Sequence, residues 1–198
     1  MKKVCLIRMN DLAQDDLVDL LAAVERGEVD AFDRLVAAVY PELKKLAHFQ
    51  LAGERSGHTL NTTAIVHEAY VRLSGSEGSW TDRRHFLRAS SKVMRHLLVD
   101  HARKRNSNKR GGGAKVLTLE EGRLINADDS LAVLALEDAI KEIGEIDPRL
   151  EEIVECRFFT GLSVSETAEA LGTSTRTVER GWQRARAYLL SALDIGDE

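Results

Sequence analysis

The residues whose types and spacing could do chemistry lie near the C-terminus of this 198-residue chain, in a stretch rich in arginine. Arginine can donate two hydrogen bonds to guanine in the major groove of DNA, and glutamine can pair in the same way with adenine. Counted at about 100° per residue along a helix, five polar side chains fall on one side. They are Arg176, Glu179, Arg180, Gln183 and Arg184.

The residues around them predict two helices separated by a tight turn. Ser163 and Glu166 have the spacing of a capping box, so we expect a first helix over about 164–171. Gly172 ends it, since glycine accepts a left-handed backbone without steric cost. The second helix, which Thr173 or Ser174 can cap, has an apolar stripe formed by Val178, Trp182, Ala185 and Leu189. This pattern is typical of a DNA-binding helix-turn-helix, and the alternative is a solvated face on an ordinary helical hairpin.

A second basic stretch is predicted to be a long helix over about 82–105. On one arc of this helix lie Arg84, Arg88, Lys92, Arg95 and Arg103, next to an arc of apolar residues. At about 1.5 Å of rise per residue, this row runs for roughly 30 Å, which is long enough to follow several phosphates. The alternative is again a solvated face, but a row of like charges on one helix destabilises it. We therefore predict contact with a nucleic-acid backbone.

Charge is distributed unevenly along a chain whose formal net charge is −4. Between Arg83 and Arg110 there are ten basic residues and one acidic residue, a local balance of +9. Between Glu137 and Phe158 there are eight acidic and three basic residues, a balance of −5. This asymmetry predicts one face for nucleic acid and another for solvent or a basic partner.

Patterns typical of enzymes and metal sites are missing from the sequence. His67-Glu68 has no second histidine four residues later, and the glycines at 111–113 do not form a phosphate-binding loop. The two cysteines, Cys5 and Cys156, are too few for a disulfide framework or a cysteine zinc site. No apolar run is long enough for a membrane span, and the first eight residues do not predict an export signal. We expect a cytoplasmic protein without a cofactor, a metal or catalytic activity.

The periodicity predicts an all-α chain of two small helical domains joined by a flexible linker. We expect an N-terminal extension at 1–11, a helical domain at 12–106, the linker at 107–130 and a helix-turn-helix domain at 131–195. Helical patterning begins after Met9, so a start at Met9 is an alternative to Met1. The expected N-terminal caps of the second, third, fourth, fifth and sixth helices are Asp30, Thr62 or Thr63, Thr81, Ser130 and Asp147.

Over roughly residues 12–193, this order of parts resembles the extracytoplasmic-function (ECF) type of sigma-70 RNA polymerase initiation factor, and an ECF-like subgroup within it. Residues 27–35, 64–73 and 86–110, which include Asp-His-Ala-Arg-Lys-Arg, resemble region 2 of that family. Residues 136–193, with Gly-Leu-Ser-Val-Ser-Glu-Thr-Ala and Thr-Val-Glu-Arg, resemble region 4. Two departures are Ala64, where many members carry an acidic residue, and Gly181, which weakens the second hairpin helix by about 1 kcal/mol relative to alanine.

The resemblance implies core RNA polymerase and promoter DNA as partners, and it leaves open an anti-sigma protein. Polymerase binding would involve His67, Glu68 and Arg72. Contacts near the −10 element would come from Trp80, Arg84, Arg88, Lys92, Arg95, Arg103, Lys104 and Arg105. Contacts to the −35 element would come from Thr175, Arg176, Thr177, Glu179, Arg180, Gln183 and Arg184.

Two alternatives remain at this point. Trp80 either stacks on an unpaired base or fills a gap in the core. The whole chain, instead of acting as a polymerase subunit, could be a stand-alone helix-turn-helix regulator, which would bind duplex DNA tightly by itself.

Overall fold

The computed structural model of the chain describes residues 14–51, 61–75, 80–108, 118–120, 123–125 and 130–193. Its elements in chain order are α1 (Gln14–Glu25), α2 (Ala31–Gln50), α3 (Thr62–Ser74), α4 (Arg83–Asn108), β1 (Thr118–Glu120), β2 (Arg123–Ile125), α5 (Ser130–Ile146), α6 (Pro148–Val154), the π-helical turn η1 (Glu155–Phe159), α7 (Val164–Ala170) and α8 (Thr175–Ala192). The predicted all-α class is confirmed. The predicted N-terminal extension, and the choice between Met1 and Met9, lie outside the described residues.

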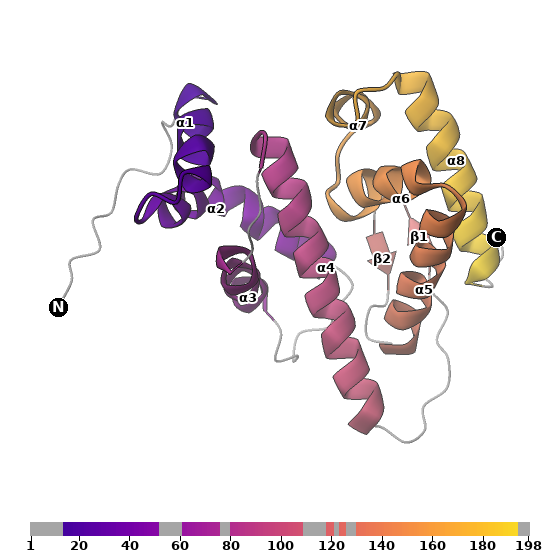
Figure 1. Cartoon of the computed structure of the whole chain (residues 1–198). Helices are drawn as coiled ribbons and strands as arrows, with labels where there is room; N and C mark the ends of the chain where they lie inside the picture. The colour runs from indigo at the N-terminus through magenta and orange to yellow at the C-terminus, as the bar shows by residue number, and fades with distance from the viewer. Residues whose placement is uncertain are drawn as a thin grey trace.

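The first half of the molecule, α1 to α4, is a helical bundle around one apolar core. Figure 1 shows α4 running through the middle of the molecule, with α1–α3 on one side and α5–α8 on the other. Helices α2, α3 and α4 direct apolar side chains into this common core. Its largest fully buried side chains are Leu35, Val39, Ile65, Phe86 and Met94.

The second half, α5 to α8, has its own core in two adjoining parts. One part joins α5, α6, η1 and α8 through residues such as Ile140, Val154 and Leu189. The other holds the α7–α8 hairpin against α6 through Ile153, Ala168 and Val178. Each half therefore buries apolar surface of its own, which is what a separate helical domain requires. The predicted boundaries at 106 and 130 stay a prediction.

Two of the predicted helix starts are displaced by one residue. The side chain of Asn61 accepts a hydrogen bond from the N–H of Ala64 at 2.8 Å, so the cap of α3 is Asn61 and not one of the following threonines. The side chain of Asp82 accepts one from the N–H of His85 at 2.8 Å, and this residue takes the role predicted for Thr81. Asparagine and aspartate rank above threonine as N-caps, which explains both corrections.

Two other predicted starts are occupied by the expected residues. Asp147 caps α6 by accepting from the N–H of Arg149 at 3.1 Å, and Pro148 is the first helical residue, as predicted. Asp30 stands at the N-cap of α2, but its side chain makes no cap hydrogen bond. The cause is its left-handed backbone, with φ of 61°.

The segment predicted as a linker contains an element that the sequence did not predict. Helix α4 continues to Asn108, and β1 and β2 pair in antiparallel register, with Leu119 opposite Leu124. Most of the rest of the segment lies outside the described residues.

None of the helices in the described ranges is long and apolar enough to cross a bilayer.

The two halves are in direct contact along α4, a feature that the sequence analysis left open. Helix α4 packs against α5 and η1, and α2 also reaches η1. The buried side chain of Gln50 on α2 donates to the hydroxyl of Ser91 on α4 at 2.8 Å and to the carbonyl of Phe159 on η1 at 3.4 Å. One amide group thus ties the first half to the second.

Candidate nucleic-acid interface

The α7–α8 hairpin has the local geometry that the sequence predicted. Ser163 and Glu166 form a reciprocal capping box at the start of α7, with the Ser163 N–H donating to the Glu166 carboxylate at 2.8 Å. Gly172 follows α7 with φ of 60°, a conformation that favours glycine. The hydroxyl of Ser174 then caps α8 by accepting from the N–H of Thr177 at 3.1 Å. These contacts fix the angle at which α8 leaves the turn.

One side of α8 is buried against α6, and Gly181 is part of that side. Val178, Ala185 and Leu189 are buried as predicted, and Trp182 is half-buried. Gly181 is buried as well, and a methyl group in place of its hydrogen would overlap Cδ1 of Ile153. Glycine at 181 therefore allows α8 to approach α6 closely, a role that its low helix propensity did not reveal.

The opposite side of α8 presents the residues predicted to read DNA. All seven are exposed to solvent: Thr175, Arg176, Thr177, Glu179, Arg180, Gln183 and Arg184. The hydroxyl of Thr177 is engaged with that of Ser174 at 2.8 Å, so it takes part in the cap. Arg184 lies 3.7 Å from the carboxylate of Asp147. The hairpin thus holds two arginines, Arg176 and Arg180, at the N-terminal end of an exposed helix face.

A groove of about 290 Å³ runs between the start of α8 and the start of α6. Its walls include Arg176, Arg180 and Arg184 from α8, and Arg149 from α6. Arg149 is exposed and was not predicted as a site residue. The sequence indicated only that Arg149 follows the Asp147-Pro148 helix start and therefore lies at a helix N-terminus. That this terminus lies beside α8 is a consequence of the fold.

The basic row of α4 lies beside carboxylates of the second half. Arg84 pairs with Glu169 at 2.6 Å, and Lys92 lies 3.9 Å from Glu151. Arg95 is buried, with 4% of its surface exposed, and it pairs with both Glu137 and Glu155. Three of the predicted cations therefore face carboxylates of the second half, Arg95 in a buried position and Arg84 and Lys92 in partly exposed ones. The partners of Lys92 and Arg95 come from the acidic stretch 137–158, which packs against α4, and the partner of Arg84 comes from α7. Contact of these residues with DNA stays a prediction.

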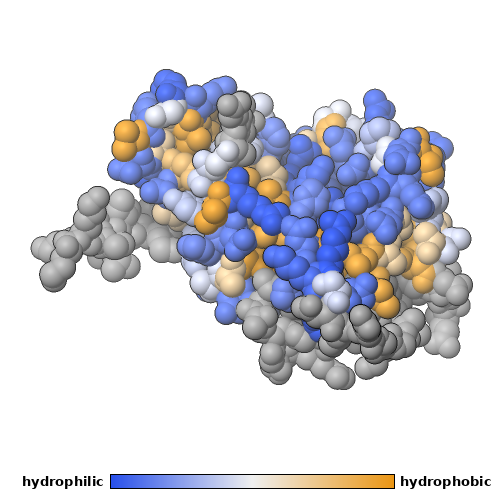
Figure 2. All heavy atoms as spheres, turned by 60° about the horizontal axis from the view of Figure 1, so that its bottom comes forward, coloured by the Kyte–Doolittle hydropathy of each residue, from blue (hydrophilic) through white to orange (hydrophobic). Residues whose placement is uncertain are grey.

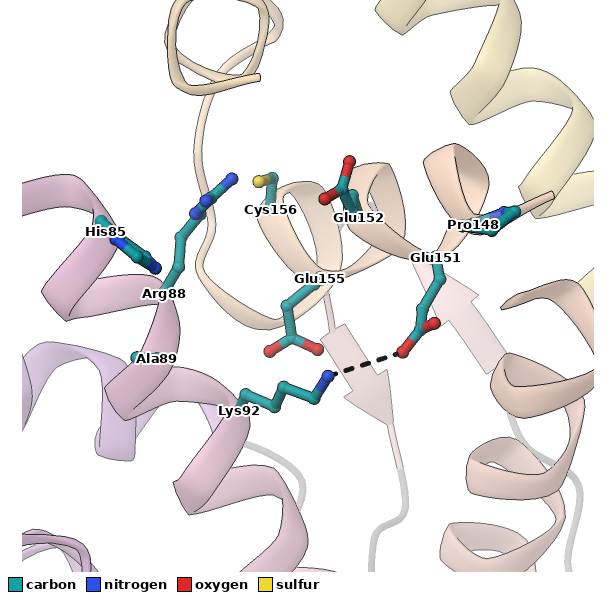
Figure 3. A pocket seen from close by; sticks show the side chains of 9 residues that line it. All are labelled: His85, Arg88, Ala89, Lys92, Pro148, Glu151, Glu152, Glu155 and Cys156. Carbon is teal, nitrogen blue, oxygen red and sulfur yellow. Dashed lines mark ion pairs between the residues drawn. The ribbon is translucent and has the colours of Figure 1, made fainter. Parts of the chain in front are cut away.

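Arg88 faces the second half too, across a pocket of about 380 Å³ (Figure 3). His85, Arg88 and Lys92 of α4 line one wall, and Glu152, Glu155 and Cys156 line the other. Burial raises the pKa of the Cys156 thiol, an effect that the Arg88 guanidinium partly opposes. Burial also raises the pKa of the Glu155 carboxyl against the opposing charge of Arg95.

In the last turns of α4, two of the predicted cations are accessible to solvent. Arg103 and Lys104 are exposed and Arg105 is half-buried. Arg103 lies 3.6 Å from Asp100 on its own helix. In Figure 2, hydrophilic side chains form a band across the visible face between two lobes.

Trp80 lies against the core of the first half. Its ring meets that of Phe86 edge-on at 5.0 Å between centroids, and it lies 5.9 Å from the ring of Phe32. The side chain is half-buried in this cluster. These contacts favour the core-filling interpretation, and stacking of Trp80 on a base stays a prediction.

The residues predicted to bind polymerase share the exposed side of α3. His67, Glu68 and Arg72 are all accessible to solvent. Arg72 pairs with Asp100 of α4 at 2.8 Å, which fixes its guanidinium beside α4. Across the described part of the chain, no group of three or more His, Cys, Asp or Glu side chains could hold a metal ion. The predicted lack of a cofactor stays a prediction.

Comparison with known proteins shows similarity to one family of transcription proteins. A family model described as ECF sigma factor matches residues 14–195. The ECF RNA polymerase sigma factor BldN of Streptomyces coelicolor is 25% identical over 173 residues. That match covers 85% of this chain and 62% of the relative, so the chain spans less than two thirds of the length of the curated relative.

Proposed function

The chain belongs to the ECF sigma factor family, and on that premise we propose that it acts as a sigma factor, directing RNA polymerase to promoters for transcription initiation. The observation that carries the proposal is the exposed face of α8. Its arginines and glutamine are exposed on the second helix of a helix-turn-helix. Both helices of this motif have an N-terminal cap, and the opposite side of α8 is buried. This is the arrangement in which side chains of a recognition helix reach base edges in the major groove.

In this proposal the two halves divide the work. The second half reads the −35 element through α8, with Arg176, Arg180 and Gln183 as base-reading candidates. Arg149 is an additional candidate for the phosphate backbone, because it is exposed beside the same groove. The first half binds core polymerase through α3 and contacts the −10 element through α4. Each module can bind weakly, since a common polymerase raises the effective concentration of both.

The remaining parts of the proposal concern partners and location. We expect core RNA polymerase and promoter DNA as partners, in the cytoplasm, without a catalytic activity or a cofactor of the chain itself. An anti-sigma protein is a further candidate partner, and α3 and α8 are the exposed surfaces that it would have to cover to block both functions.

The test is transcription in vitro with core polymerase and a promoter selected by the wild-type protein. Arg180→Ala should reduce transcription that depends on the −35 element by about tenfold or more, since one bidentate base contact contributes about 1–3 kcal/mol of discrimination. Arg186→Ala is the matched control, because Arg186 is an exposed arginine later on the same helix. Binding to core polymerase should be the same for all three proteins.

Two outcomes would contradict the proposal. One is failure of the wild-type protein to bind core polymerase. The other is specific duplex binding by the chain alone without any effect of added polymerase, which is the behaviour of a stand-alone regulator.

A further inference from the structure

The basic face of α4 and the acidic face of the second half meet in a series of ion pairs, here named the closed contact. Its members are Arg84–Glu169, Lys92–Glu151, Arg95–Glu137 and Arg95–Glu155. The cations at 84, 92 and 95, with Arg88 between them, lie on one side of α4 over roughly 16 Å, at about 1.5 Å per residue. The carboxylates come from α5, α6, η1 and α7, which are all elements of the second half.

The centre of the closed contact is the Arg95 guanidinium. It is buried between Glu137, which is 4% exposed, and Glu155 at 3.1 Å. Its cation also lies 5.2 Å from the centre of the Phe159 ring. The π-helical turn η1 contributes both Glu155 and Phe159 to this one side chain, and such turns are frequent at functional sites.

The outer pairs of the closed contact are far more open to water. The side chains of Arg84 and Glu169 are 42% and 67% exposed, and Lys92 is 53% exposed. Ion pairs at such exposure contribute little to stability and weaken with salt. The closed contact therefore depends mainly on the buried pairs of Arg95.

We propose that the second half competes with DNA inside the same molecule: its carboxylates occupy the α4 cations, and α4 takes a nucleic-acid backbone only when the closed contact opens. The proposal rests on the proposed function, which gives α4 its DNA ligand. Carboxylates and phosphates accept charge-assisted hydrogen bonds from guanidinium groups in the same way, so one excludes the other. Helix α8 carries no such restriction, because its DNA face is exposed in the closed arrangement.

Cys156 provides a direct reporter of opening. It is fully buried on the wall of the pocket that Arg88 and Ala89 of α4 complete, and Figure 3 shows Arg88 extending toward its sulfur. Separation of α4 from the second half uncovers the thiol. Replacing the other cysteine, Cys5→Ser, leaves Cys156 as the only thiol in the chain.

The experiment compares Glu137→Gln with Asp138→Asn, both in the full-length Cys5→Ser protein. Each variant removes one negative charge from adjacent positions of α5, but Glu137 is buried against Arg95 whereas Asp138 is exposed. Two quantities are measured: the rate at which a thiol reagent modifies Cys156, and the Kd for a short fluorescent single-stranded DNA. Circular dichroism verifies that each variant keeps its helices.

Glu137→Gln should raise the thiol rate and lower the DNA Kd, each by roughly tenfold or more, because both scale with the fraction of open molecules. Asp138→Asn should behave like the wild type. A faster thiol reaction with an unchanged DNA Kd would overturn the proposal, because the contact would then open without releasing a DNA site. A thiol rate equal to that of the control would overturn it as well.

If Glu137→Gln loses helicity, the same two measurements are made on the double variant Glu151→Gln/Glu169→Gln. This variant removes the carboxylates that pair with Lys92 and Arg84 at the exposed ends of the closed contact. Its matched control is Asp138→Asn/Glu145→Gln, which removes two exposed charges from α5. A faster thiol reaction together with tighter DNA binding supports the proposal, and an unchanged thiol rate overturns it. Failure of the proposed function is distinguishable, since it appears as a lack of polymerase-dependent transcription and leaves the thiol measurements unaffected.

Discussion

The cations of α8 and those of α4 are similar in type and in spacing, but their surroundings are opposite. On α8, Arg176 and Arg180 extend into solvent from a helix whose other side is buried. On α4, Arg84 and Arg95 are paired with carboxylates from the other half of the chain. The α8 face is therefore open to solvent, whereas the α4 face lies against the acidic surface of the second half. The two faces differ in their neighbours, so substitutions on them should have different effects.

The largest expected effect is loss of the cation at the centre of the closed contact. Arg95→Met should lower the free energy of unfolding by about 3–5 kcal/mol, because the carboxylates of Glu137 and Glu155 would lose the guanidinium buried between them. Arg180→Met on α8 should change it by less than about 0.5 kcal/mol, as for most exposed sites. Urea denaturation of both variants measures the contrast.

A triple variant separates lost charge pairing from lost packing. If Glu137 and Glu155 are also replaced by Met, stability should return toward the wild-type value, since well-packed apolar groups often replace a buried ion pair without loss. If Arg95→Met and Arg180→Met were equally stable, the prediction would be wrong, because loss of a cation would then change the free energy of unfolding by the same amount on both helices.

A smaller effect is expected from disturbing the close packing of Gly181 in α8 against α6. Gly181→Leu should destabilise the protein by about 1–3 kcal/mol through overpacking against Ile153. Ala187→Leu is the control, because Ala187 is exposed on the same helix. Thermal unfolding distinguishes the effects: helix propensity alone would make Gly181→Leu stabilising. A gain in stability would mean that α8 does not need the close approach to α6.

The sequence predicted the α8 face well because its determinants are local. The caps at Ser163 and Ser174 and the apolar stripe through Val178 are set by spacing within one hairpin, and they are confirmed. Gly181 was interpreted only through its helix propensity. Its contact with Ile153 depends on how α8 packs on α6, and no periodicity within one helix reveals that distance.

The surroundings of α4 could not be predicted in the same way. The charge balances of +9 and −5 in the two stretches indicated that a basic and an acidic surface exist. They did not indicate that the acidic surface covers the basic one, because Arg95 and Glu137 are 42 residues apart in the chain. Such a pairing is set by tertiary packing. The same holds for Trp80, whose place beside Phe32 and Phe86 follows from the packing of three separate segments.

The smallest expected effect concerns pH. Burial raises the pKa of Glu155 in the folded protein, and this outweighs the charges of Arg95 and Lys92 and the hydrogen bond from Ser91, which lower it. The nearby charge of Glu151 adds to the rise. A carboxyl group with a raised pKa binds its proton more tightly in the folded state. Its contribution to stability is therefore complete below the unfolded pKa of about 4.3 and is lost as pH rises through the folded pKa.

Glu155→Gln removes this titration and isolates it from all others. The stability of the wild type relative to Glu155→Gln should fall as pH is raised from the acidic range to neutrality, by at most about 1.4 kcal/mol per pH unit for one proton. Denaturant unfolding of both proteins at matched pH values measures the difference. The same comparison for Gln183→Ala on α8 should be independent of pH, because neither side chain titrates. A relative stability of the wild type that rises with pH would mean that its ion pair with Arg95 outweighs burial, and that the closed contact gains strength when Glu155 ionises.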